Sequence, residues 1–190
     1  MEYCSCIRGL PCEKASDFIF FLDSARRACY NFDIKKDRGV SMDEKMMRRA
    51  IACAKKAAAM GEVPVGAVVV CDGKVIATGY NRREKDKNAL RHAEITAIDR
   101  ACKRAGGWRL HKCDLYVTLE PCPMCAGAII NARIKNVYIG AMDPKNGAMG
   151  SVTSLHEMFT HRPVVETGIL GEECAKLLTD FFSRLRKTKE

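Results

Sequence analysis

Asp114-Leu-Tyr-Val-Thr-Leu119 runs directly into Glu120-Pro-Cys-Pro-Met-Cys125. The first six residues are rich in β-branched and aromatic side chains, which favour a strand. A helix tolerates proline in its first turn, so the prolines around Cys122 predict a helix over residues 122–132. The sequence therefore predicts a strand followed at once by a helix that begins with two cysteines.

Helices and strands alternate on both sides of this segment. Ser41-Met-Asp-Glu44 forms a capping box, which predicts a helix that Gly61 can close. Asp72-Gly73 is a two-residue hairpin signal between predicted strands at 65–71 and 74–80. The remaining predictions are helices over 92–104 and 172–186 and strands over 135–140 and 164–166. This alternation predicts an α/β fold with three layers, αβα.

The composition is that of a globular protein. The 190 residues are 47% hydrophobic and 29% charged, which excludes a wholly disordered chain or a fibre. No apolar run approaches the roughly 20 residues of a membrane span, and the N-terminus lacks the basic start of a signal peptide. We therefore expect no membrane partner and a cytoplasmic location. In such a reducing compartment, the odd number of cysteines, 11, favours metal binding and packing over disulfides.

The net charge of +9 is unevenly distributed. Residues 1–40 contain seven basic and six acidic side chains, so residues 41–190 carry +8. Such a charge fits a partner that carries phosphates, and it equally fits a solvated basic surface.

Three residues form a predicted metal site. His92 begins one predicted helix, and Cys122 and Cys125 begin another after an interval of 29 residues. Thiolates at a helix N-terminus are stabilised by the helix dipole and by a bound metal. Three protein ligands with an open fourth position are typical of catalytic zinc. We expect one zinc ion per chain, held by His92, Cys122 and Cys125.

Glu94 is the predicted catalytic residue. Zinc lowers the pKa of a bound water to about 7 and so provides a hydroxide nucleophile. A carboxylate two residues from a ligand can accept the proton of that water and deliver it to a leaving group. Residues i and i+2 of a helix face different sides, which argues against Glu94 as a fourth ligand.

The spaced pattern H-x-E…P-C-x-x-C is the signature of zinc nucleobase deaminases. It is far more specific than a C-x-x-C pair alone. Gly61-Glu-Val-Pro-Val-Gly66 has the glycine spacing of a P-loop, but Ala67 and Val68 occupy the Lys and Ser/Thr positions. We therefore expect a deaminase that binds no nucleoside triphosphate.

From about residue 43 to residue 186 the chain resembles the tRNA-specific adenosine deaminases of the TadA type. The resemblance implies a cytidine-deaminase-like fold with a five-stranded mixed sheet, a homodimer, and hydrolytic conversion of the wobble adenosine of a tRNA anticodon to inosine. The matching stretches are Glu62-Val-Pro-Val-Gly-Ala67, Gly79-Tyr-Asn81, His92-Ala-Glu-Ile95, residues 115–128, residues 140–147 and Asp180-Phe-Phe182.

The resemblance also implies four substrate contacts. Asn81 would form a hydrogen bond with the target nucleoside, Val65 would help wall the base pocket, and the backbone of Ala93 would read the edge of the base. Asp143 would lie on an RNA-contacting loop. From the residues alone, Asn81 can also be explained as a turn residue, and Asp143 is equally well explained as one.

Two basic segments are predicted to contact RNA. Arg82 begins the first, and Arg184 and Arg186 lie in the second, near the C-terminus. Either segment could be a solvated face, but a nucleic-acid substrate favours phosphate contacts. The unpaired bases of an anticodon loop can enter a pocket without duplex opening.

Two regions depart from the family pattern. Residues 1–40 have no counterpart in it, so we interpret them as an N-terminal extension of unassigned role that can be poorly ordered, with Met42 as an alternative start. Residues 41–190 form the expected zinc-dependent deaminase domain. Lys87-Asn-Ala-Leu-Arg91 replaces the small residues that usually precede the metal histidine, which leaves recognition of the flanking nucleotides open.

Two alternatives to a tRNA deaminase stay open. The first is a deaminase of a free base or nucleoside, of the guanine or cytosine type. The second is a non-catalytic RNA-binding module stabilised by zinc. The basic charge argues against the first, and the proton-shuttle position of Glu94 argues against the second.

Overall fold

The computed structural model describes residues 41–187. The predicted extension, residues 1–40, lies outside the described residues, as do residues 188–190.

The described part of the chain contains a mixed sheet of five strands. They are β1 (Gly66–Cys71), β2 (Lys74–Tyr80), β3 (Cys113–Leu119), β4 (Asn136–Ala141) and β5 (Val164–Thr167). Their order in the sheet is β2-β1-β3-β4-β5. β1 is antiparallel to both β2 and β3, whereas β3, β4 and β5 are parallel. The predicted five-stranded mixed sheet is confirmed.

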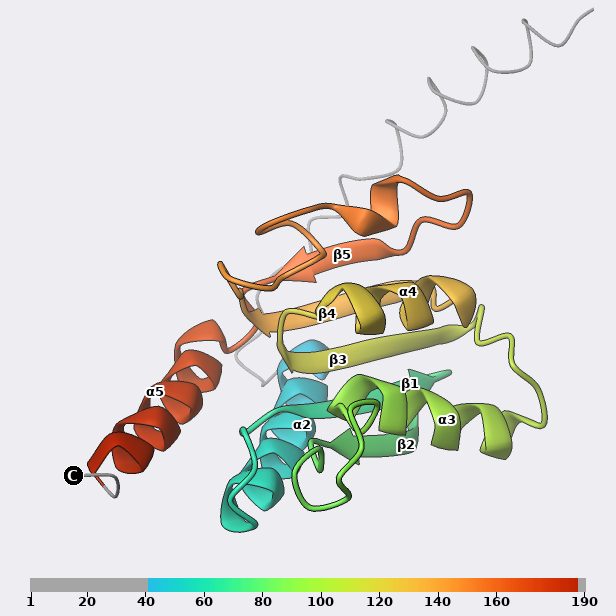
Figure 1. Cartoon of the computed structure of the whole chain (residues 1–190). Coiled ribbons are helices and arrows are strands. Elements are labelled where there is room, and N and C mark those ends of the chain that lie inside the picture. The colour runs from blue at the N-terminus through green and yellow to red at the C-terminus, as the bar shows by residue number, and fades with distance from the viewer. Residues whose placement is uncertain (1–40, 188–190) are drawn as a thin grey trace, which may run out of the picture. The chain divides into compact units, whose positions relative to one another are not determined.

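Helices cover both faces of the sheet, which confirms the three layers (Figure 1). They are α2 (Met42–Ala59), α3 (Ala93–Ala105), α4 (Pro123–Asn131) and α5 (Gly171–Lys187). α3 and α4 lie side by side on one face, and α2 and α5 pack on the other. A short 3-10 helix, Leu155–Glu157, was not predicted from the sequence.

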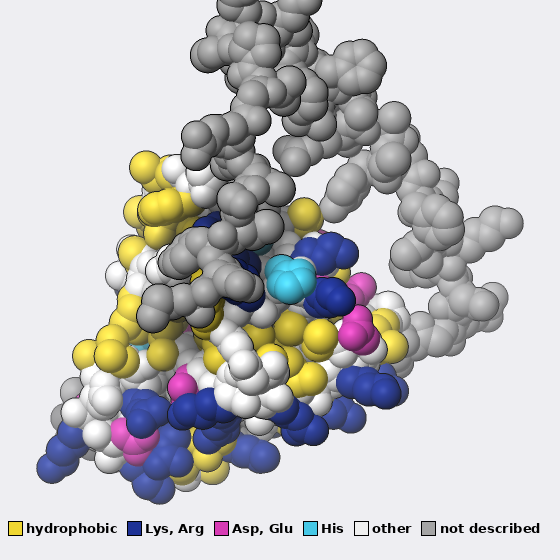
Figure 2. Space-filling model, turned by 90° about the vertical axis from the view of Figure 1, so that its right-hand side faces the viewer, with side chains coloured by type: hydrophobic (Ala, Val, Ile, Leu, Met, Phe, Trp, Pro, Cys, Tyr) yellow, Lys and Arg dark blue, Asp and Glu magenta, His cyan; other side chains and the backbone are white. Residues whose placement is uncertain are grey.

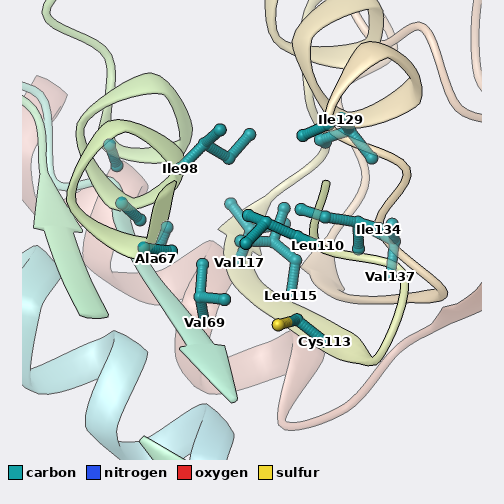
Figure 3. Close-up of a cluster of buried hydrophobic side chains, with 14 of the residues drawn as sticks. Ala67, Val69, Ile98, Leu110, Cys113, Leu115, Val117, Ile129, Ile134 and Val137 are labelled. Atoms are coloured by element: carbon teal, nitrogen blue, oxygen red, sulfur yellow. The ribbon is translucent and has the colours of Figure 1, made fainter. Parts of the chain in front are cut away.

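The two hydrophobic clusters follow the alternation of strand side chains. In β3, Leu115 and Val117 enter the cluster beneath α3 and α4, which Ile98 and Ile129 complete (Figure 3). Tyr116 points to the opposite face, where its ring stacks on a neighbouring tyrosine of β4. Each face of the sheet is therefore covered by its own pair of helices.

The structure has a helix cap and a hairpin turn where short sequence patterns predict them. The Ser41 side chain caps α2 by accepting a hydrogen bond from the Glu44 backbone N–H at 3.1 Å. Asp72 and Gly73 both have positive φ, as the hairpin turn between β1 and β2 requires. Gly79 in β2 lies so close to the first turn of α3 that a Cβ there would collide with the Ala93 carbonyl oxygen. The start of α3 is thus seated directly on the sheet.

Candidate active site

The predicted metal site lies where two helices begin. His92 occupies the N-cap position of α3, and Cys122 occupies the N-cap position of α4. Pro123 occupies the first turn of α4, where its missing N–H costs nothing. Cys125 lies in that same first turn and is buried. The strand-to-helix step after β3 therefore brings both cysteines to the histidine.

The three side chains have the geometry of a metal site. The Nδ1 atom of His92 lies 3.7 Å from the Cys122 sulfur and 3.6 Å from the Cys125 sulfur. All three atoms lie within 4.8 Å of one another. Tetrahedral zinc with the usual Zn–S and Zn–N bond lengths sets an N···S separation of about 3.6 Å. The donor set therefore fits one zinc ion.

The two thiols differ strongly in acidity. The hydrogen bond from Cys125, aided by the His92 ring, lowers the pKa of Cys122 to about 4 against the opposing effect of burial. The same hydrogen bond, together with burial, raises the pKa of Cys125. The pair thus holds one thiol proton, and its release leaves two thiolates, which are donors that zinc prefers.

Glu94 lies beside this group but is not part of it. Its side chain is only 4% exposed, and burial raises its pKa to about 7. The nearby His92 and the start of the helix backbone act in the opposite direction. A carboxyl group with such a pKa can both accept and donate a proton near neutral pH.

A pocket of about 360 Å³ opens over the site. His92, Glu94 and Cys122 line it, while Cys125 lies buried beneath the lining. The four residues that were predicted to contact substrate also line it, namely Val65, Asn81, Ala93 and Asp143. The structure therefore brings the predicted catalytic, metal and substrate residues together around one cavity.

The pocket also has lining residues that the sequence analysis did not single out. They are Val63, Arg83, Leu119, Glu120, Pro123 and Asn146. Glu120 and Pro123 belong to the motif that carries the cysteines, so the motif itself could have indicated them. No signal in the sequence distinguishes Arg83 from its neighbours.

Glu120 is a buried carboxylate that holds one wall of the pocket. It accepts hydrogen bonds from the backbone N–H groups of Asp143 at 2.9 Å, Met149 at 2.9 Å and Ser151 at 3.0 Å. The Ser151 hydroxyl is a fourth donor. Burial acts to raise the pKa of Glu120, but these hydrogen bonds outweigh burial and lower it. The loop with Asp143 is thus tied to the end of β3.

The residues predicted to contact RNA lie outside the pocket lining. The Arg82 guanidinium forms two parallel hydrogen bonds with Asp86, at 2.7 and 3.1 Å, whereas its neighbour Arg83 reaches the pocket. Arg184 and Arg186 lie on α5, and Arg186 donates a hydrogen bond to the Ser183 hydroxyl.

No helix among residues 41–187 is both long and apolar enough to cross a membrane.

Comparison with known proteins agrees with the geometry. Residues 41–186 match the family described as MafB19-like deaminase. A tRNA-specific adenosine deaminase of Bacillus subtilis is 49% identical over 153 residues, which cover 80% of this chain and 95% of that protein.

Two solved structures extend this comparison. One, from a study of A-to-I editing by tRNA:A34 deaminases at the wobble position, is 45% identical with a TM-score of 0.69, covering 70% of this chain and 99% of its own. A guanine deaminase of Bacillus subtilis is 44% identical with a TM-score of 0.51, covering 52% of this chain and 64% of its own. The chain therefore belongs to the family of the tRNA-specific adenosine deaminases.

Proposed function

We propose that this protein converts adenosine to inosine at the wobble position of a tRNA anticodon, consuming water and releasing ammonia. The observation that carries this proposal is the buried carboxylate of Glu94 next to the His92, Cys122 and Cys125 group, beneath a single pocket. Relatives that bear the name of this reaction match most of the chain.

His92, Cys122 and Cys125 would hold the zinc ion of this family, one per chain. When bound in such an open site, zinc activates a water as a hydroxide nucleophile near neutral pH. The side chains provide two sulfurs and one imidazole nitrogen, which leaves the fourth position for that water. Glu94 does not belong to the group that could hold the metal, which keeps its carboxylate free for proton transfer.

Glu94 would move the protons of the reaction. It would accept a proton from the attacking water and pass it to the ring nitrogen next to the reacting carbon, and would then carry the remaining proton of the added hydroxyl to the departing amine. Its raised pKa, about 7, suits both directions of transfer. Its burial fixes the carboxylate at the start of α3 and shields it from bulk water.

Four residues of the pocket would bind the target nucleotide. Val65 would pack against the base, the Ala93 backbone would read its edge, and Asn81 would form a hydrogen bond with the nucleoside. Asp143 would contact RNA from its own loop. Their common position around the pocket supports these roles.

Basic side chains would bind the phosphates of the anticodon arm. Arg82, Arg184 and Arg186 are the proposed contacts, and the +8 charge of residues 41–190 supports them. Arg82 would contact RNA from within its ion pair with Asp86. Figure 2 shows that Lys and Arg side chains gather in the lower part of one face of the molecule.

The organisation of the protein is also a proposal. We infer a deaminase domain over residues 41–190, preceded by an extension over 1–40, with Met42 as an alternative start. The match of the family to residues 41–186 supports this division. We also infer a homodimer, from the family resemblance, and a cytoplasmic location, which fits relatives named for acting on tRNA.

The reaction is tested by incubating zinc-loaded protein with total tRNA and, separately, with adenosine, guanine and cytosine. Nucleosides from digested tRNA are analysed for inosine, and ammonia is measured in every reaction. We expect inosine at position 34 of tRNA and no ammonia from the free compounds. The Glu94→Gln variant is the matched control, because it keeps the shape of the side chain without an exchangeable carboxyl proton.

Each of the other possible results would support a different function. Ammonia from a free base alone would identify a free-base deaminase, which the similarity to a guanine deaminase makes the main rival. Neither product from zinc-loaded protein would contradict catalysis and favour an RNA-binding module.

A further inference from the structure

Glu62 is a buried carboxylate that the reaction itself does not use. Its side chain is 2% exposed, and it contacts the pocket wall from outside the lining. Gly61, with φ of 78°, turns the chain at the end of α2, and the Glu62 backbone N–H donates to the Ala57 carbonyl at 3.1 Å. The position of Glu62 is thus set by the C-terminal turn of α2.

The Glu62 carboxylate determines how the Asn81 amide is turned. The nitrogen Nδ2 of Asn81 lies 3.4 Å from Oε2 of Glu62. A carboxylate oxygen only accepts hydrogen bonds, so the amide nitrogen, and not the amide oxygen, must face it. The Asn81 oxygen Oδ1 therefore points away from Glu62.

That oxygen has no hydrogen-bond partner within the described residues. Asn81 is only 8% exposed, and it lines the pocket. A buried acceptor without a partner is costly, and native proteins retain few of them. An unsatisfied acceptor at a pocket wall is the expected state of a group whose partner arrives with the substrate.

Glu62 also fixes the loop that follows Asn81. Its Oε1 accepts from the Lys85 backbone N–H at 2.7 Å, and its Oε2 accepts from the Glu84 backbone N–H at 3.3 Å. These bonds hold the segment next to Arg83, which lines the same pocket. One carboxylate therefore anchors both a substrate-facing amide and the backbone beside it.

We propose that Glu62 is a positioning residue that turns Asn81 so that its amide oxygen accepts a hydrogen bond from the bound nucleotide. This inference rests on the proposed function. Asn81 touches the nucleotide, and Glu62 acts on the nucleotide only through Asn81 and the 84–85 backbone.

A reciprocal exchange of donor and acceptor tests the proposal. In Glu62→Gln, one carboxylate oxygen becomes an amide nitrogen, so either the Asn81 amide or the Lys85 backbone N–H loses its acceptor. In Asn81→Asp, two carboxylates face each other, and the repulsion between their like charges disfavours this arrangement. In the double variant, the amide nitrogen at position 62 donates to the side chain at position 81, which restores the hydrogen bond with its direction reversed. The second carboxylate oxygen of residue 81 then faces the pocket as an acceptor.

The variants are compared as full-length, zinc-loaded proteins by steady-state inosine formation in a tRNA anticodon stem-loop. We expect each single variant to lose about tenfold in kcat/KM, mainly through KM, as for one buried hydrogen bond. The double variant should exceed both single variants. A merely structural Glu62 would instead give losses that multiply in the double variant, and that result would overturn the proposal. Glu166→Gln, which removes an exposed carboxylate on β5, is the control for a general effect of charge.

A second measurement does not depend on activity. The side-chain amide signal of Asn81 is followed by NMR in ¹⁵N-labelled protein and is identified by its loss in Asn81→Asp. Glu62→Gln should shift this signal, because the donor loses its carboxylate partner. An unchanged signal would contradict the orienting role, even if the wild-type protein formed no inosine and the proposed function itself failed.

Discussion

Two positions one turn apart on the same helix have opposite tasks in this protein. On α3, Glu94 lies at the pocket and Ile98 lies in the hydrophobic cluster. On α4, Cys125 lies at the metal group and Ile129 lies in that same cluster. Side chains at i and i+4 share a helix face, so one face carries chemistry at its first turn and packing at its second.

The comparison shows how the fold separates activity from stability. The first turns hold buried polar groups, which stabilise a protein less than apolar side chains of the same size. The second turns bury aliphatic side chains against Leu115 and Val117 of β3 (Figure 3). Substitutions in the first turns should therefore change the reaction, and substitutions in the second turns should change the free energy of unfolding.

The largest effect is expected at the start of α4. Cys122→Ser replaces a soft thiolate donor by a hydroxyl, so zinc content should fall from one per chain toward zero and inosine formation should cease. Metal analysis and the tRNA assay measure both effects. Full retention of zinc and activity would show that Cys122 is not a ligand.

Glu94→Gln should leave the metal in place and remove the proton transfer. General acid–base groups contribute about 10²–10⁴-fold in rate, so kcat should fall by a factor in that range or by more. Zinc content, tRNA affinity and Tm should stay close to the wild-type values. Loss of zinc with little change in rate would assign Glu94 to the metal instead.

Ile129→Ala should give the opposite result on the same helix as the cysteines. Ile129 is fully buried, and large-to-small substitutions in a core cost about 2–5 kcal/mol of unfolding free energy. Denaturant unfolding measures this loss. The kcat measured at a temperature well below the new Tm should be unchanged. A variant with normal stability but impaired kcat would break the proposed separation.

Glu120→Gln tests a residue just before α4 that ties the loop with Asp143 to the end of β3. Losing a charged acceptor of four hydrogen bonds should cost about 1–3 kcal/mol and loosen the loop with Asp143, which raises KM for tRNA. Because the pKa of Glu120 is lowered in the fold, its stabilisation is present above the ordinary glutamate pKa and is lost as the pH falls through the lowered value.

The difference in stability between wild type and Glu120→Gln should therefore shrink in strongly acidic solution. Thermal unfolding measured from neutral to acidic pH would show it. A difference that is constant over that range would mean that the Glu120 charge contributes nothing to stability.

The elements and the metal group were predictable because their signals are local. The capping box at Ser41, the Asp72-Gly73 turn and the C-x-x-C pair each lie within a few residues. The structure has the first as a cap, the second as a turn, and the third in a group that could hold a metal. The roles of the metal and catalytic side chains, His92, Glu94, Cys122 and Cys125, stay predictions until measured.

The polar support of the pocket was not predictable in the same way. Arg82 pairs with Asp86 and leaves Arg83 at the pocket, which depends on the path of a loop that has no periodic pattern. The side chains of Glu62 and Glu120 meet their donors 19 to 31 residues away in sequence. A single sequence gives no register for such contacts, because they depend on how separate loops pack.

The smallest effect is expected away from these catalytic turns, at the start of α2. Ser41→Ala removes the hydroxyl that accepts the Glu44 N–H, which should cost about 0.5–2 kcal/mol of unfolding free energy and leave kcat unchanged. A chain that begins at Met42 loses the same cap, so it should still deaminate tRNA with a similar loss of stability. Comparing the two variants by denaturant unfolding separates the cap from the preceding residues, because only the shorter chain lacks residues 1–40. If the shorter chain lost far more stability than Ser41→Ala, residues 1–40 would contribute to the fold, and the division of the protein at residue 41 would be wrong.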